Sequence, residues 1–214
     1  MRQMPTVMLV HGLGRHQSSL KTMARSLRHV GYPVVNWAYR STRQTLTDAA
    51  RQLHHAYSIV AQHADCIHFV THSMGGMVLR RLLALEALPQ LGKIAMIAPP
   101  NNGSIVAQRL LGNPLLSAVL GPAAQELRDP AYLQATCALP VVPTLVIAGT
   151  KALDVRNPTS LLSATFLHEP SDGTVAVRET RLPHMARFVE VPDCHTWMMN
   201  HPRTVREIVT FFGT

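Results

Sequence analysis

The sequence has few cysteines, and they follow no recognisable pattern. Only three of its 214 residues are cysteine (Cys66, Cys137 and Cys194), an odd number without a C-x-x-C spacing. This argues against a disulfide framework and against a zinc site built on thiolates. The twelve histidines include no H-E-x-x-H motif, so we expect no metal site and no cofactor. Reduced thiols favour a cytoplasmic protein.

Long apolar runs are also missing. The apolar stretch in MRQMPTVMLVHG is shorter than a secretory h-region and is not followed by a small-residue cleavage site, so we expect no signal peptide. The longest uncharged stretch, 130–150, contains Pro140 and Pro143 and several polar residues, and it does not predict a membrane span. With 47% apolar and 15% charged residues, the sequence predicts a soluble, ordered chain forming one domain over residues 1–214.

Acidic residues are scarce relative to basic ones. The chain has 20 Lys and Arg, 17 of them Arg, against 12 Asp and Glu, which gives a net charge of +8. Such a balance favours anionic partners. The arginines are scattered, however, with no basic run longer than Arg80–Arg81 and no nucleic-acid-binding motif. We therefore expect no nucleic acid, and leave contact with a membrane surface and the oligomeric state open.

Short β-branched runs alternate with stretches of helical period. The predicted strands are Thr6–Val10, Pro33–Trp37, Cys66–Val70, Ile94–Ala98, Thr144–Ala148 and Phe188–Val191. They are apolar on both faces, as strands of a buried parallel sheet are. Apolar residues at helical spacing lie between the early strands, at 20–30, 46–60 and 77–85. The pattern predicts an α/β fold with a mostly parallel six-stranded sheet and helices on both faces.

Two segments stand out from this alternation. The last helix has Asn200 as a candidate cap, Pro202 in its first turn and an apolar stripe from Val205 to Phe212. The stretch Ile105–Leu139 is long, interrupted by prolines and apolar in pieces. It predicts a small insertion that forms a cap or a pocket wall, with ordinary core helices as the alternative.

The segment HFVTHSMGGMVLRRLL places Ser73 between an apolar strand and a helical pattern. It resembles the nucleophile elbow of the α/β-hydrolases, in which a serine sits on a sharp strand-to-helix turn. The usual G-x-S-x-G is here Thr71-His72-Ser73-Met74-Gly75, so the first glycine is replaced by a β-branched residue. The alternative for a serine at this place is a simple helix N-cap.

A second segment, VMLVHGLGRHQSS, resembles the loop that builds half of the oxyanion hole in the same family. The resemblance implies that the backbone N–H groups of Leu13 and Met74 would be the oxyanion donors. For His11 we expect a buried structural role, with contact to the substrate as the alternative.

The family order requires an acid and then a histidine after the serine. His195 lies between the last strand and the last helix, where the family carries its general base, so the resemblance implies His195 as that base. The competing histidines are His168, His184 and His201.

Two aspartates compete for the acid. Asp172 lies in EPSDGTVAVRET, which resembles the segment that carries the acid in small bacterial lipases, and Asp154 lies closer to the end of the fifth strand. The Asp-Gly turn favours Asp172. Asp193 is only two residues from His195, which is too close along an extended chain.

The resemblance covers Val7 to about Phe212 and is closest to compact bacterial lipases and esterases. In APPNNGSIVAQ it implies that Asn102, Gly103 and Ser104 border the substrate cleft, with a plain polar turn as the alternative. For Arg15, beside the oxyanion loop, a surface position is the alternative to holding an anionic group. Candidates for an acyl pocket, or alternatively for the core, are Leu110, Leu111, Leu115, Leu116, Val119, Trp197 and Met198.

The resemblance implies a serine hydrolase that cleaves carboxylic esters through Ser73, His195 and Asp172 with an acyl-enzyme intermediate. The substrate is expected to be a small-molecule or lipid ester. An acyl-thioesterase or an acyltransferase would use the same side chains. A non-catalytic ligand-binding protein on a hydrolase scaffold is the alternative from another class.

Overall fold

The computed structural model describes residues 4–214 and contains one six-stranded sheet. The strands are β1 (Thr6–Val10), β2 (Val34–Trp37), β3 (Ile67–His72), β4 (Leu91–Ile97), β5 (Thr144–Gly149) and β6 (Arg187–Val191). They pair in the order β2-β1-β3-β4-β5-β6, and every pair is parallel. The predicted α/β sheet is thus confirmed. β4 begins at Leu91, earlier than the expected Ile94, because Leu91 already pairs with Ile67.

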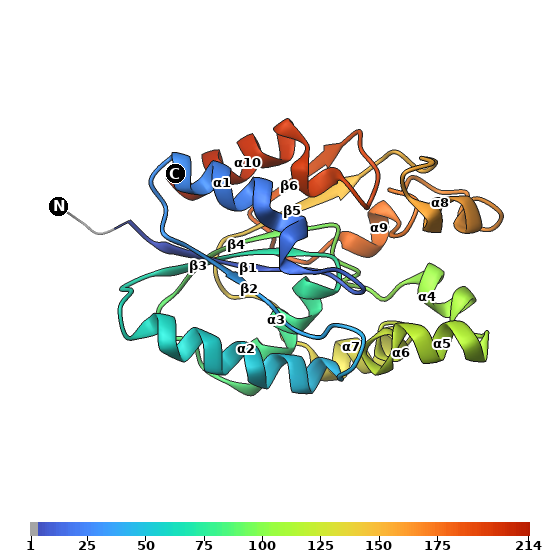
Figure 1. Ribbon diagram of the computed structural model, residues 1–214, viewed down its shortest axis with the longest axis horizontal. Helices are drawn as coiled ribbons and strands as arrows, with labels where there is room; N and C mark the ends of the chain where they lie inside the picture. The colour runs from blue at the N-terminus through green and yellow to red at the C-terminus, as the bar shows by residue number, and fades with distance from the viewer. Residues whose placement is uncertain (1–3) are drawn as a thin grey trace.

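Helices cover both faces of the sheet (Figure 1). Helices α1 (Lys21–His29) and α10 (Pro202–Gly213) lie on one face, and α2 (Leu46–Ala61) and α3 (Met74–Leu85) lie on the other. Two apolar clusters fill the layers between them. Leu27, Val70 and Ile208 belong to the first, and Leu53, Phe69 and Met77 to the second. The central strands are apolar on both sides because each side faces one of these clusters.

The direction of winding reverses next to β1. The chain passes from β1 outward to β2 and then returns to form β3 on the opposite side of β1. The loops after β1 and β3 therefore diverge from neighbouring carboxyl ends. In open parallel sheets this switch point is where ligands bind.

The insertion predicted near Ile105–Leu139 is present between β4 and β5. It consists of four short helices: α4 (Ile105–Leu110), α5 (Pro114–Leu120), α6 (Pro122–Glu126) and α7 (Pro130–Thr136). Prolines stand at the start of the last three, where a helix needs no backbone N–H. Gly121, between α5 and α6, has φ +80°, and a Cβ there would overlap the Thr42 carbonyl. The insertion therefore packs tightly on the loop after β2.

Two more short helices, α8 (Pro158–Ser163) and α9 (Val177–Thr180), lie between β5 and β6. In Figure 1 they stand across from α4 and α5, at the same end of the sheet. The chain also has 3₁₀ turns at Gln17–Leu20 and Met198–Asn200. Among residues 4–214 no helix combines the length and apolarity that crossing a membrane requires.

The cap of α10 differs from the expectation. Asn200 ends the 3₁₀ turn that precedes the helix, and His201 is the N-cap. The Nδ1 of His201 accepts a hydrogen bond from the Arg203 N–H at 3.2 Å. Asn200 does not cap α10 because it is the last residue of the 3₁₀ turn, one position before the N-cap.

Candidate active site

Ser73 stands at the point where β3 passes into α3. Its backbone has φ 53° and ψ −126°, a conformation that L residues rarely adopt and that concentrates at functional sites. Ser73 is also the N-cap of α3, but its side chain makes no capping hydrogen bond. The hydroxyl is thus available to other partners, unlike that of an ordinary N-cap serine.

Two glycines allow this turn to approach the loop after β1. A Cβ on Gly75 would lie 2.5 Å from the Val10 carbonyl oxygen, and a Cβ on Gly12 would lie 3.0 Å from the Ser73 Cβ. Larger residues at either position would push the serine away. The unusual Thr71 causes no such conflict, because it is still an extended β3 residue, paired with Val10 and Met96.

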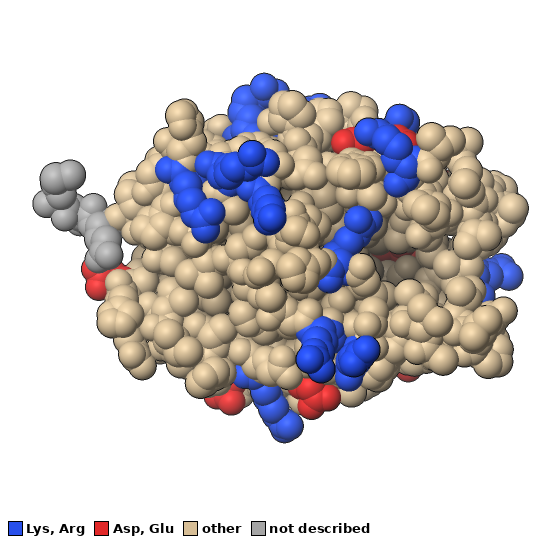
Figure 2. Space-filling model, in the orientation of Figure 1, with Lys and Arg blue, Asp and Glu red and all other residues tan. Residues whose placement is uncertain are grey.

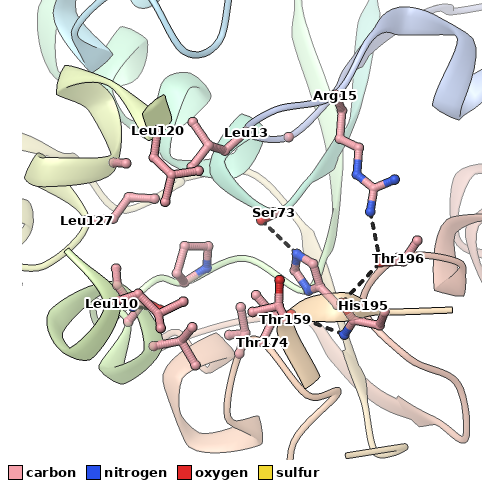
Figure 3. Close-up of a pocket in the computed structure, with 18 of the residues that line it drawn as sticks. Leu13, Arg15, Ser73, Leu110, Leu120, Leu127, Thr159, Thr174, His195 and Thr196 are labelled. Atoms are coloured by element: carbon pink, nitrogen blue, oxygen red, sulfur yellow. Dashed lines mark hydrogen bonds between the residues drawn. The ribbon is translucent and has the colours of Figure 1, made fainter. Parts of the chain in front are cut away.

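His195 links the serine to a carboxylate. Its Nε2 lies 3.0 Å from the Ser73 Oγ (Figure 3). Its Nδ1 lies 2.7 Å from the Asp172 Oδ2. His195 is 7% exposed and Asp172 is 1% exposed. An ionised carboxylate can only accept, so Nδ1 carries the proton and Nε2 offers its lone pair to the serine hydroxyl.

Asp172 is fixed by its own turn. Its Oδ1 accepts hydrogen bonds from the N–H groups of Thr174 and Val175, at 2.9 and 2.7 Å. Its backbone carbonyl accepts the N–H of His195 at 3.0 Å. Gly149, at the end of β5, leaves room for this turn, because a Cβ there would lie 2.6 Å from the Asp172 Cβ. The acid and the imidazole are therefore tied together through both side chains and backbone.

The rival Asp154 has different partners. Its carboxylate binds Lys151 at 2.7 Å and Arg156 at 2.6 Å, and these hydrogen bonds hold its pKa well below the usual range. Oxygens of Asp154 and Asp193 lie within 4.8 Å of each other and of the Cys194 thiol. Arg156 also lies 3.6 Å from Asp193. This group is an ion-pair cluster whose carboxylates are already bound by side-chain cations.

The three competing histidines lie elsewhere. His168 and His184 are exposed, and His201 caps α10. The structure thus brings together Ser73, His195 and Asp172 out of all the candidates named from the sequence.

The two expected oxyanion donors flank the serine. Met74 is the first residue of α3, so its N–H has no acceptor within the helix. Leu13 follows Gly12 in the loop after β1, and Gly12 and Leu13 line the same cavity as Ser73. Within residues 4–214 the N–H groups of Leu13 and Met74 make no hydrogen bond. Two free donors therefore stand beside the serine.

His11 packs beneath the surface against the loop after β1 and contacts Gly12. It is fully buried and stacks on Tyr39 at a ring separation of 4.4 Å. Its Nδ1 lies 3.0 Å from the Gly12 carbonyl oxygen, and the Tyr39 hydroxyl donates to the His11 carbonyl at 2.8 Å. Burial lowers the pKa of His11. A neutral His11 fixes the position of Gly12.

His72 is a residue that the sequence reasoning did not single out. It is 1% exposed, and its Nε2 lies 3.1 Å from the backbone carbonyl of His195. The two rings are 4.9 Å apart. Since a carbonyl only accepts, Nε2 carries the proton. Burial, together with the nearby His195 and Arg15, holds the pKa of His72 well below 6.5, so this ring is neutral.

Ser73 opens into a cavity of about 270 Å³. In Figure 2 the surface is hollowed on the right, between the part that carries α8 and the part that carries α4 and α5. One wall is apolar. Figure 3 shows Leu110, Leu120 and Leu127 grouped on one side of Ser73, and Arg15 and Thr196 on the other. The cavity thus has an apolar end and a polar end, with the serine between them.

Some expected cleft residues line this cavity and others do not. Ser104 lines it while also capping α4, and so do Leu110 and Leu111. Asn102 points away, because its amide donates to the carbonyls of Arg178, Glu179 and Arg181. Trp197 is 44% exposed and lines a separate surface hollow. The others outside the lining are Gly103, Leu115, Leu116, Val119 and Met198.

The sequence reasoning missed several lining residues. Leu120 and Leu127 lie at the ends of α5 and α6, and Thr159 and Thr174 come from the segment between β5 and β6. The prolines at the helix starts mark where α5 and α6 begin, but no signal in the sequence tells which side of such short helices faces the cavity.

Comparisons with known proteins agree with this architecture. No family model matches the chain, and no curated protein matches it. Several solved structures, in contrast, superpose on this chain. The lipase BlEst2 of Bacillus licheniformis in its mature form superposes with a TM-score of 0.80 at 17% identity, covering 99% of this chain and 93% of that one.

Two further structures come from metagenomes. The carboxyl esterase MGS0156 superposes with a TM-score of 0.69 at 18% identity, over 99% of this chain and 76% of that one. A structure from work on the lipolytic enzymes LipS and LipT superposes with a TM-score of 0.67 at 16% identity, over 100% of this chain and 96% of that one. The parallel sheet and these neighbours agree on one architecture. This chain has the α/β-hydrolase fold and resembles bacterial lipases and esterases in structure.

Proposed function

We propose that this protein hydrolyses carboxylic esters, with Ser73 as the nucleophile, His195 as the general base and Asp172 as the acid. The observation that carries the proposal is the unbroken chain from Ser73 Oγ through His195 to Asp172, with distances of 3.0 and 2.7 Å, at the wall of a cavity with an apolar end. A hydroxyl is too weak a nucleophile by itself, and this arrangement is the one that activates it.

The reaction follows from the proton positions. As the Ser73 oxygen attacks the ester carbonyl, its proton passes to the His195 Nε2. The imidazolium formed is stabilised by the buried Asp172 carboxylate. His195 then gives the proton to the leaving alcohol, and an acyl group remains on Ser73. Water, activated by the same imidazole, releases the acid.

The backbone donors stabilise the intermediate. When the carbonyl becomes tetrahedral, its oxygen gains negative charge, and the free N–H groups of Leu13 and Met74 are the donors beside it. The N-terminus of α3 adds a favourable dipole. One such donor typically contributes about 3 kcal/mol to the transition state.

The apolar end of the cavity selects the acyl side. Val106, Leu110 and Leu127 offer carbon surface and no charge. At about 270 Å³ the cavity is near the lower end of ligand sites, which begin at about 300 Å³. Esters of short to medium apolar acids are therefore the substrates proposed.

Fluorophosphonate labelling with peptide mapping tests the nucleophile. We expect the label on Ser73 of the folded protein and none on Ser73→Ala, together with loss of p-nitrophenyl butyrate hydrolysis in that variant. A folded protein that takes no label at Ser73 contradicts the proposal and favours a ligand-binding role. Butyryl thioesters and added alcohols, assayed in parallel, separate hydrolysis of oxygen esters from thioester cleavage and acyl transfer.

A further inference from the structure

The cavity is bordered at its polar end by a cation without a counter-ion. Arg15 follows the loop that carries Leu13 and lines the cavity together with Ser73. Its guanidinium donates one hydrogen bond, to the Thr196 Oγ1 at 2.9 Å. No carboxylate of residues 4–214 forms an ion pair with it. Several of its N–H donors thus remain free beside the reacting serine.

Arg15 also lines a second hollow next to the cavity. This hollow has a volume of about 390 Å³ and is bordered by Arg40 and Arg43 as well. The Gly14 N–H donates to the Ser41 Oγ at 3.0 Å, which ties the Arg15 turn to the loop that carries the other two arginines. Neither Arg40 nor Arg43 has an ion-pair partner in the described part of the chain. The three arginines form what we call the Arg15 site.

The stretch of sequence that carries these three arginines contains no acidic residue. Residues 1–47 contain seven Lys and Arg and no Asp or Glu, so this segment alone accounts for +7 of the net +8. Burial of Arg15 opposes its charge and lowers its pKa. A half-buried guanidinium without a carboxylate is costly unless an anion binds it.

The two ends of the cavity suggest how an ester would lie. The leucines of the apolar end stand on one side of Ser73, and Arg15 stands on the other (Figure 3). An acyl chain among the leucines directs the alcohol part of the ester toward Arg15. A phosphate on that alcohol would meet the planar fork of a guanidinium, which binds phosphate oxygens in pairs.

We propose that the Arg15 site binds a phosphate group carried on the alcohol side of the ester, so that the preferred substrates are acyl esters of phosphorylated alcohols. This inference rests on the proposed function, since it assigns the leaving group of the same reaction. The shared chemistry is a phosphate monoester close to the scissile bond. Arg15 contacts it from the cavity, and Arg40 and Arg43 complete the site from the adjoining hollow.

A matched pair of substrates tests the inference. 1-Butyryl-glycerol 3-phosphate and 1-butyrylglycerol differ only in the phosphate, and both are soluble as monomers at low concentration. For the unmodified protein we expect kcat/KM to be higher for the phosphorylated ester by about tenfold to a hundredfold. The preference should fall at high salt, since part of the site is exposed.

Variants locate the effect. Arg15→Gln should reduce the phosphate preference to near one, and the double variant R40Q/R43Q should reduce it partly. Arg15→Lys keeps the charge but loses the fork, so it should restore only part of the preference. Arg203→Gln is the control, because Arg203 is exposed on α10 and its loss changes the net charge equally. Arg203→Gln should leave kcat/KM unchanged for both esters.

Each arm has an outcome that overturns the inference. Equal kcat/KM for the two esters, with Ser73-dependent hydrolysis of the neutral ester intact, rejects the phosphate site and leaves the esterase proposal standing. Absence of hydrolysis and labelling rejects the esterase proposal itself. A preference that appears only with anionic phospholipid vesicles assigns the arginines to a lipid surface instead.

Competition distinguishes the source of the phosphate. Glycerol 3-phosphate should inhibit hydrolysis of p-nitrophenyl butyrate more strongly than inorganic phosphate does, because it also occupies the position of the alcohol. Inhibition that is unchanged in Arg15→Gln would show that the anion binds elsewhere.

Discussion

The Nε2 of His72 donates a hydrogen bond to the backbone carbonyl of His195, at 3.1 Å, and the two rings lie 4.9 Å apart. His72, the residue before Ser73, thus fixes the backbone of His195, whose ring contacts the serine hydroxyl. Both groups are buried, so water cannot replace this bond if it is lost. His72 acts through His195 and is a positioning residue in the proposed reaction.

Replacement of His72 tests this role. His72→Phe keeps a ring but leaves the His195 carbonyl without a donor, which should cost about 1–3 kcal/mol of stability. We expect kcat for p-nitrophenyl butyrate to fall about tenfold with KM little changed, because the imidazole loses its alignment. His72→Gln supplies an N–H and should recover part of kcat. A lower Tm with an unchanged kcat in His72→Phe would limit His72 to packing.

The two aspartates separate by their partners. In Asp172→Asn the Oδ1 can still accept the N–H groups of Thr174 and Val175, but the amide nitrogen then faces His195. The ring must place its proton on Nε2, where it cannot accept the serine proton. We expect kcat to fall by about four orders of magnitude without loss of fold by circular dichroism.

Asp154→Asn is the matched comparison. It weakens the ion pairs with Lys151 and Arg156, which are about half exposed, and leaves the His195 bonds intact. We expect a lower Tm and a kcat close to that of the unmodified protein. The reverse pattern in the two variants would assign the acid to Asp154.

The glycine after the serine turn is tested by a single methyl group. In Gly75→Ala the new Cβ would lie 2.5 Å from the Val10 carbonyl oxygen and 2.8 Å from that of His11, both of them backbone atoms. Strand and helix must separate, at a cost of about 1–3 kcal/mol, and fluorophosphonate labelling of Ser73 should slow. Gly112→Ala is the control, since its nearest neighbour would lie at 3.6 Å. Equal Tm values for the two variants would refute the close approach.

Buried neutral histidines should make the fold sensitive to acid. Burial lowers the pKa of His68 to about 4, whereas an unfolded histidine titrates near 6.5. Between these values the unfolded chain binds a proton that the native chain does not. Stability contributed by neutral His68 is therefore present above pH 6.5 and is lost as the pH falls toward 4. His11 and His72, whose pKa values are also lowered, add to the effect.

Urea unfolding at pH 4.5–7.5 measures this loss. We expect the free energy of unfolding to fall on acidification, by up to about 1.4 kcal/mol per pH unit for each such histidine. His68→Gln should show a shallower slope, and replacement of the exposed His55 by Gln should not change it. Equal slopes for His68→Gln and the unmodified protein would contradict the role of His68.

The sequence predicted the sheet well because its strands are buried on both faces and read as continuous apolar runs. Ser73, His195 and Asp172 could be named because the segments around them resemble motifs of the α/β-hydrolases, each at a strand end or in a turn. The positions of Asn102 and Trp197 outside the cavity could not be predicted from such motifs. Asn102 turns away because of carbonyls at 178–181, which become its neighbours only after folding. The cap of α10 shifted to His201 because a 3₁₀ turn occupies Asn200.

The ties between the Asp172 turn and His195 run through side chains and backbone alike, whereas the apolar end of the cavity comes from the insertion between β4 and β5. For the proposed reaction, this places the reacting groups and the apolar wall in separate stretches of the gene. Substitutions in residues 105–127 would then change the shape of the apolar end while Ser73, His195 and Asp172 keep their geometry. If the proposed function holds, this segment is the one that a directed-evolution library for acyl-chain length should randomise.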